Sequence, residues 1–224
     1  MTDTVESGGA QPMIKVWDRV VRVGHWVLVG GFAVAYLTGE DGPEGLHVWA
    51  GYAIAVTVAL RVVWGFIGPE KARFADFVTG PGRALGYLQG LLKGTAPRHV
   101  GHSPAGGLMA VALLAMMAGT VWTGMILYAQ EENAGPLAPF YGNQTAALAM
   151  PSLISPAMAD EDDDVHEGRD GRGGEGGESM EELHEFFANA VLFLALLHVA
   201  GVIIASRAHH ENLVQGMIDG MKRP

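Results

Sequence analysis

The sequence predicts an all-α integral membrane protein built as a four-helix bundle. Of its 224 residues, 49% are apolar, and the mean hydropathy is positive at +0.21. Four separate stretches are long and apolar enough to cross a bilayer. The net charge of −10 does not argue against this prediction, because the acidic residues are concentrated near residues 160–185 and are scarce in the apolar stretches.

The four predicted spans cover residues 20–38, 46–68, 105–129 and 183–205. A helix needs roughly 20 mostly apolar residues to cross the hydrocarbon core. None of the four stretches carries the polar stripe that a helix of a soluble bundle would expose to water. An even number of spans places both termini on the same side of the membrane.

The orientation follows from the charges beside the spans, because Lys and Arg are enriched in cytoplasmic segments. The N-terminal flank, the loop between the second and third spans, and the tail are all rich in Lys and Arg. Both termini are therefore expected in the cytoplasm. No cleavable signal peptide is visible, so the first span is expected to act as the insertion signal.

The chain is expected to have four parts. The first two are a disordered tail over residues 1–13 and three spans with a cytoplasmic loop over 14–129. The last two are an acidic flexible periplasmic loop over 130–182 and the fourth span with a cytoplasmic tail over 183–224. The third loop combines Pro and Ala with an acidic run at residues 160–164 and a Gly-rich stretch. It is either a solvated linker or an acidic tether for a basic electron-transfer partner.

The chemistry available to the chain is limited by the absence of cysteine. Without thiolates, the chain forms no disulfide, no thiolate-bound zinc or iron–sulfur site, and no c-type haem attachment. Any metal must be bound by His, Met or carboxylates. Between their rims the four spans contain no Asp or Glu, which disfavours a proton or cation carrier.

Four of the nine histidines lie inside or at the rims of the spans: His25, His47, His184 and His198. One such imidazole is commonly explained by a hydrogen bond to a neighbouring helix. However, the fourteen residues between His184 and His198 correspond to ~21 Å and nearly four turns, so both project from nearly the same face. His25 lies near the level of His198 on the cytoplasmic side, and His47 lies near the level of His184 on the outer side.

These matched depths predict two bis-histidine pairs, each binding one haem b between the helices. Haem iron accepts two axial imidazoles from facing helices of a bundle. Arg22 and Arg61, near the cytoplasmic end, would either pair with propionates of the inner haem or act as positive-inside anchors. Gly24, Gly30, Gly31 and Gly201 would either make room for a macrocycle or pack bare helices. The remaining histidines lie in loops or the tail, and most of them are expected to be solvated: His99, His102, His166, His209 and His210. A metal site at His99 and His102 is disfavoured, because no third ligand is evident.

The chain resembles the bacterial di-haem membrane cytochrome b family, which includes the cytochrome b subunit of nickel-iron hydrogenases, the gamma subunit of formate dehydrogenases and stand-alone quinol-linked cytochromes. Three regions carry the resemblance: KVWDRVVRVGHWVL, LHVWAGYAIAVTVALRVVWGFIGPEKARFADF and HEFFANAVLFLALLHVAGVIIASRAHHENLVQGMIDG. The resemblance implies two haems b, electron exchange with a quinone, and the same four histidines as ligands. The long acidic loop departs from the family pattern.

The sequence therefore predicts electron transfer across the inner membrane between a periplasmic redox protein (a hydrogenase, a dehydrogenase or a cytochrome c) and the quinone pool. One alternative is an autonomous quinone-linked oxidoreductase that reacts with a small oxidant such as superoxide at the outer face. Another is a haem-free permease or structural anchor. No nucleic-acid partner is expected, and a homodimer is left open. Polar groups after the fourth span give the quinone candidates His209, Glu211 and Asn212.

Overall fold

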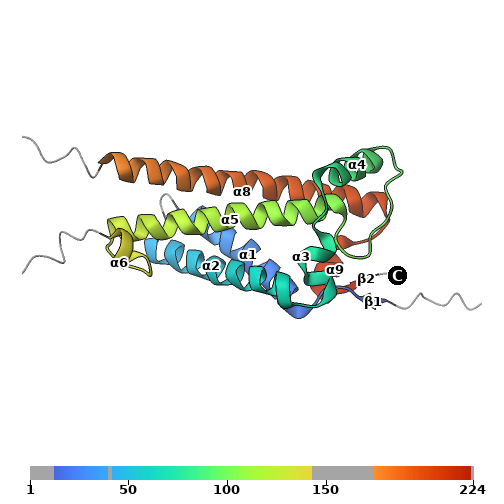
Figure 1. Ribbon diagram of the computed structural model, residues 1–224, viewed down its shortest axis with the longest axis horizontal. Helices are drawn as coiled ribbons and strands as arrows, with labels where there is room; N and C mark the ends of the chain where they lie inside the picture. The colour runs from blue at the N-terminus through green and yellow to red at the C-terminus, as the bar shows by residue number, and fades with distance from the viewer. Residues whose placement is uncertain (1–12, 40–41, 143–173, 223–224) are drawn as a thin grey trace, which may run out of the picture. The chain divides into compact units, whose positions relative to one another are not determined.

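The computed structural model describes residues 13–39, 42–142 and 174–222, and it is mostly helical (Figure 1). Four helices are long and apolar enough to cross a membrane: α1 (Arg19–Leu37), α2 (Glu44–Ile67), α5 (Pro104–Glu131) and α8 (Gly174–Ala208), in which the span is Ser179–Ala208. The predicted fold class is confirmed, and each span lies within a few residues of its expected position. Residues 1–12 of the predicted tail (1–13) and the acidic run at 160–164 lie outside the described residues.

The chain divides into two compact units, one of Met1–Ala115 with Val191–Pro224 and the other of Met116–Ala190. In the first unit, α1 begins where the Asp18 carboxylate accepts a hydrogen bond from the Val21 amide (3.1 Å). Two glycines of α1 face α2: a Cβ at Gly31 would lie 3.1 Å from Ile54, and one at Gly24 would lie 3.4 Å from Thr57. Small residues thus let α1 and α2 pack closely.

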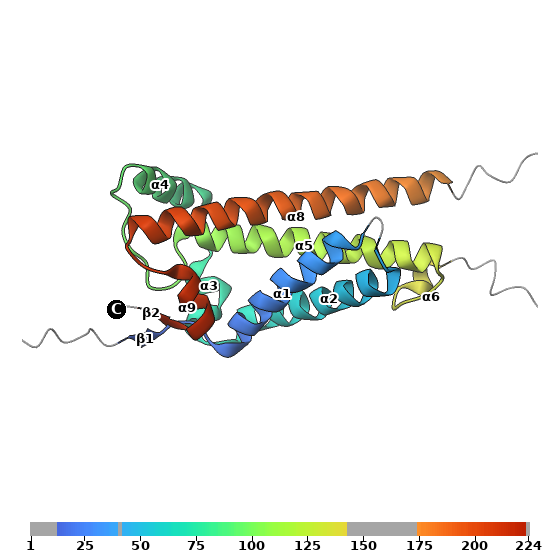
Figure 2. The same ribbon diagram turned by 180° about the vertical axis from the view of Figure 1, so that it is seen from behind.

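The N-terminal flank and the tail of the chain meet in the first unit. Strand β1 (Ile14–Lys15) pairs antiparallel with β2 (Met221–Lys222), and helix α9 (Leu213–Asp219) lies beside them in both views (Figures 1 and 2). Lys222 is only 5% exposed and lies 3.8 Å from a carboxylate oxygen of Glu211. The tail is therefore folded against the rest of the unit.

The loop between α2 and α5 is also structured. It contains η1 (Glu70–Ala72), α3 (Phe74–Phe77) and α4 (Pro81–Leu92). Ala72 joins Val16, Trp17 and Val21 in a small apolar core. The loop thereby packs against the start of α1.

The second unit holds the later part of α5, helix α6 (Ala138–Tyr141) and the first part of α8. Helix α8 begins at Gly174, whereas the sequence predicted a flexible loop up to residue 182. Residues 174–182 contain Glu175, Glu178, Glu181 and Glu182, and acidic side chains suit the first turns of a helix because of the helix dipole. Gly174, Gly176 and Gly177, which disfavour helix, account for the loop that the sequence predicted here. The connection between α5 and α8 is therefore shorter than the predicted loop, because α5 extends to Glu131 and α8 begins at Gly174.

A substitution at Gly65 tests the packing of α3 on α2. Gly65 is buried, and a Cβ there would overlap the Phe74 ring. We expect Gly65→Ala to lower the free energy of unfolding by about 1–3 kcal/mol, as overpacked sites do. Gly51→Ala is the matched control on the same helix, because a Cβ at Gly51 meets nothing within 4 Å. Thermal unfolding of the purified protein measures both, and an equal Tm for the two variants would contradict this packing.

Candidate functional site

His25 of α1 and His198 of α8 face each other within the first unit. Their ring centroids lie 6.5 Å apart, with the ring planes inclined by 53°. A metal ion bound between two imidazoles, at about 2 Å from each nitrogen, holds those nitrogens roughly 4 Å apart and the ring centroids farther apart. The observed separation therefore leaves room for an axially coordinated iron between the rings.

The described part of the first unit contains several buried polar nitrogens without partners, one of them on this histidine pair. Among the described residues, His25 Nδ1, Arg22 Nε and Arg61 Nη1 are buried and make no hydrogen bond. Buried polar groups in proteins are normally paired, so these three atoms fit a site that takes a polar ligand. A haem would bring propionate carboxylates, which guanidinium groups bind well.

His47 is held at the start of α2 by a hydrogen bond within the first unit. Its Nδ1 lies 2.9 Å from the carbonyl oxygen of Ala35. A carbonyl oxygen only accepts, so Nδ1 carries the proton and Nε2 is the unprotonated nitrogen. This is the tautomer in which Nε2 serves as a metal ligand.

His184 is held in the same tautomer in the second unit. Its Nδ1 lies 3.0 Å from Thr123 Oγ1, which also lies 2.9 Å from the Gly119 carbonyl oxygen and 3.0 Å from that of Thr120. The hydroxyl has one proton, which it donates to one of these carbonyls, so it accepts the hydrogen bond from His184 Nδ1–H. Gly124 faces the same ring, because a Cβ there would lie 2.9 Å from His184 Cε1.

The structure thus brings His25 and His198 together, while His47 and His184 belong to different units and each is oriented by its own neighbours. The glycines separate into two groups. Gly24 and Gly31 pack against α2, whereas a Cβ at Gly30 or Gly201 would meet nothing within 4 Å. Helix packing accounts for the first pair, and open space lies beside the second pair.

The three quinone candidates have structural partners. His209 Nε2 lies 3.2 Å from Tyr87 Oη, and Glu211 forms an ion pair with Arg98 at 3.1 Å. Asn212 caps α9, because its side-chain oxygen accepts the Gln215 amide hydrogen bond at 2.9 Å. Glu211 and Asn212 line an open hollow of about 450 Å³, together with Val202, Ile203, Ser206, Arg207, His210 and Val214.

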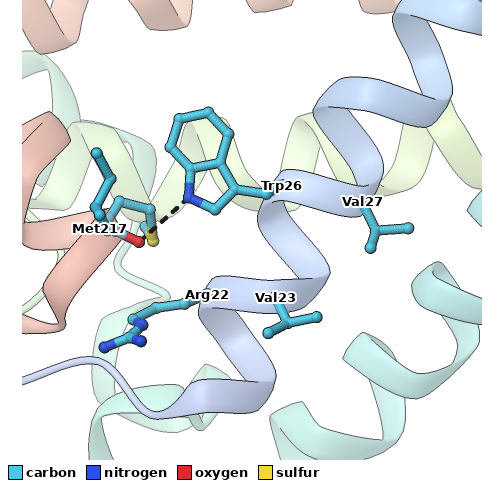
Figure 3. Close-up of a pocket in the computed structure, with 6 residues that line it drawn as sticks. Arg22, Val23, Trp26, Val27 and Met217 are labelled. Carbon is cyan, nitrogen blue, oxygen red and sulfur yellow. Dashed lines mark hydrogen bonds between the residues drawn. The ribbon is translucent and has the colours of Figure 1, made fainter.

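A second hollow, of about 400 Å³, lies between α1 and α9 (Figure 3). Arg22 and Trp26 extend from α1 on the side where Met217 lies, and the Trp26 indole N–H donates to the Met217 carbonyl (3.3 Å). Arg22 Nη1 donates to the Asp219 carbonyl. Arg22 therefore links the tail to α1 through one nitrogen while its Nε is left without a partner.

His102, which the sequence predicted to be solvated, is partly buried, and its Nδ1 is fully enclosed without a partner among the described residues. Its ring packs on Phe77 with centroids 4.2 Å apart and meets Trp17 edge-on at 4.6 Å. Burial, with smaller contributions from the charges of Arg61, Lys222 and His198, lowers the pKa of His102 to about 3. The imidazole is therefore neutral at pH 7. No spacing in the sequence could have revealed this, because the contacts come from distant segments.

The chain was compared with protein families, curated proteins and solved structures. The model of the family described as prokaryotic cytochrome b561 matches residues 16–220, a range that includes all four membrane-spanning helices and all four histidines. No curated protein and no solved structure matches the chain.

Proposed function

Because this chain belongs to the prokaryotic cytochrome b561 family, we propose that it carries electrons across the bacterial inner membrane through two bis-histidine haems b, between a periplasmic redox partner and the quinone pool. Membership makes the chain a membrane cytochrome b that transfers electrons. The number of haems, their ligands, the quinone and the periplasmic partner belong to the proposal.

The observation that carries the proposal is the facing pair of His25 and His198, 6.5 Å apart between ring centroids. A bound haem b supplies a one-electron couple of its iron. The two imidazoles would hold the inner haem from opposite faces, and the unpartnered donors of Arg22 and Arg61 would bind its propionates. His47 and His184, each held with Nε2 unprotonated, would hold the outer haem.

The proposed orientation of the protein in the membrane follows from the positions of its Lys and Arg residues. Lys and Arg gather in the N-terminal flank, in the loop between α2 and α5, and in the tail, so these segments are proposed to be cytoplasmic. The inner haem then lies near the cytoplasm and the outer haem near the periplasm. Helices of this length cross a core about 30 Å thick, so two haems at these levels would form one conducting path.

A reduced-minus-oxidised absorption spectrum of the purified protein tests the proposal. Two b-type haems per chain, quantified after extraction into alkaline pyridine, are the expected result. A quinol added to the protein in membranes should then reduce both haems. A protein without b-type bands would be a permease or an anchor, and haems that no quinol reduces would remove the quinone from the proposal.

The quinone is proposed to exchange protons at the tail, near His209, Glu211 and Asn212. We expect His209→Ala and Glu211→Gln to slow quinol-driven haem reduction about 10²-fold, the lower end of what general acid–base groups contribute, while the haem spectrum stays intact. Stopped-flow absorption measures the rate. Asn212→Asp tests the third residue without removing the side-chain oxygen that caps α9. Unchanged rates of haem reduction in His209→Ala and Glu211→Gln would mean that the quinone binds elsewhere, for example beside the outer haem.

A further inference from the structure

His102 is enclosed by other side chains, and it is not one of the proposed axial ligands. Its ring is stacked between Phe77 and the edge of Trp17, at centroid distances of 4.2 and 4.6 Å. Its Nδ1 is buried and makes no hydrogen bond within the described part of the chain. A buried polar nitrogen left unpaired is unfavourable, so this atom is suited to a hydrogen-bond partner other than the described residues.

Arg61 contributes a second unpaired donor to the same place. Its guanidinium carbon lies 5.1 Å from the Phe74 ring centroid and 5.7 Å from that of Phe77, the ring on which His102 stacks. Arg61 Nη1 is also buried without a hydrogen-bond partner among the described residues.

The carboxylate that acts on Arg61 is already engaged in hydrogen bonds. The carboxylate whose charge acts on Arg61 is that of Asp18. One of its oxygens accepts the Val21 amide hydrogen bond, and the other accepts the Trp64 indole N–H at 3.3 Å. Asp18 therefore holds the start of α1 and leaves Arg61 Nη1 without an acceptor.

Positively charged groups lie close enough to His102 to act on it. Arg61, Lys222 and His198 are the groups whose charges act on it. Two of these are cations, and the third is the proposed axial ligand of the inner haem. A carboxylate in this position would satisfy two buried donors and offset the positive charge.

We propose that His102 is a haem-positioning residue, which donates a hydrogen bond from Nδ1 to a propionate of the inner haem, beside Arg61. The inference rests on the haem-binding function proposed above. A haem held by His25 and His198 carries its propionate carboxylates at the edge of the macrocycle, and His102 and Arg61 provide the matching donors. His102 does not touch the iron, so it acts on the orientation of the haem and on the charge beside it.

Paired substitutions separate the hydrogen bond from the packing. His102→Phe keeps an aromatic ring against Phe77 and Trp17 but removes the donor, whereas His102→Gln keeps an N–H group. We expect His102→Phe to weaken retention of the inner haem about 10- to 100-fold, the range for a hydrogen bond to a charged group. The midpoint potential of that haem should also fall, because a less neutralised propionate stabilises ferric iron. His102→Gln should restore both.

The matched control is His99→Phe, on the same loop. The ring of His99 already has a partner, since its Nδ1 donates to the Pro97 carbonyl at 3.0 Å. Retention is measured as transfer of haem from the purified full-length protein to apomyoglobin, and the potential by optical redox titration. An equal shift in His99→Phe would overturn the proposal, because the effect would then belong to the loop.

Esterified haem provides a second measurement, in which the haem is changed as well as the protein. Full-length apoprotein is reconstituted with haem b or with its dimethyl ester, which lacks the carboxylate charges. Wild-type protein should retain the ester at the inner site about 10-fold or more less well than haem b. The difference between wild type and His102→Phe should disappear with the ester. Equal retention of the two haems by wild type, or a persisting difference with the ester, would overturn the proposal.

A free anion at this place would give a different result. Added inorganic phosphate would then change the potential of the inner haem, and esterification would not, which also overturns the proposal. The failure of haem binding itself is distinguishable, because wild-type protein would then hold no haem at all. If wild-type protein holds two haems and His102→Phe changes neither haem retention nor the midpoint potential, only the proposed propionate contact is refuted.

Discussion

Replacing His198 by Ala is expected to remove one of the two haems and leave the other in place. His198 faces His25 across 6.5 Å between ring centroids, and a low-spin iron between them needs both imidazoles. His25→Ala should have the same effect, because it removes the opposite ligand. The haem content per chain should therefore fall by half in either variant, and the same redox wave should disappear from both.

Pyridine haemochrome quantification and an optical redox titration measure the result. His210→Ala is the control, since this histidine is exposed and lies beyond the end of α8. Unchanged haem content and spectra in both ligand variants would refute the assignment of the inner pair. Different redox waves lost from His25→Ala and His198→Ala would refute the pairing while keeping both residues as ligands.

The inner pair could be predicted from the sequence because it depends on helix geometry alone. Residue number fixes depth along a straight helix, at 1.5 Å per residue, so His25 and His198 could be placed at one level once the spans were known. The spans themselves are recognised from local composition. Each of these steps needs no knowledge of which helices touch.

The residues that the sequence did not reveal depend on contacts between distant segments. His102 is enclosed by Trp17 and Phe77, which come from opposite sides of α2 in the chain. A loop histidine looks solvated when only its neighbours in sequence are considered. The pairing of strands β1 and β2 likewise joins the N-terminal flank to the tail.

The tail shows a different limit of sequence reasoning. His209, Glu211 and Asn212 were selected for their polar chemistry, and the structure gives each a contact within the protein: Tyr87, Arg98 and the Gln215 amide. The cap of α9 could have been recognised from the sequence, because Asn is favoured immediately before a helix. The contacts of His209 and Glu211 with the loop before α5 could not.

Replacing His184 by Ala is expected to remove the outer haem and to leave the inner haem unchanged. His47→Ala should do the same, and the redox wave lost from both should be the one that persists in His198→Ala. The measurements are those used for the inner pair. Retention of both haems by His184→Ala would refute this ligand and, with it, the path through two haems.

The neighbours of His184 allow a finer test of the same site. Thr123 is 3% exposed, and its hydroxyl accepts the hydrogen bond from His184 Nδ1–H while it donates to a backbone carbonyl of α5. Thr123→Val has nearly the same shape but no hydroxyl, so Nδ1 loses the acceptor that fixes the ring and its tautomer. Partners of this kind typically contribute 10- to 100-fold to the affinity of a metal site. We therefore expect Thr123→Val to increase the loss of the outer haem by about that factor. Thr123→Ser keeps the hydroxyl and should behave as wild type, so equal haem loss from the Val and Ser variants would show that the hydroxyl does not orient His184.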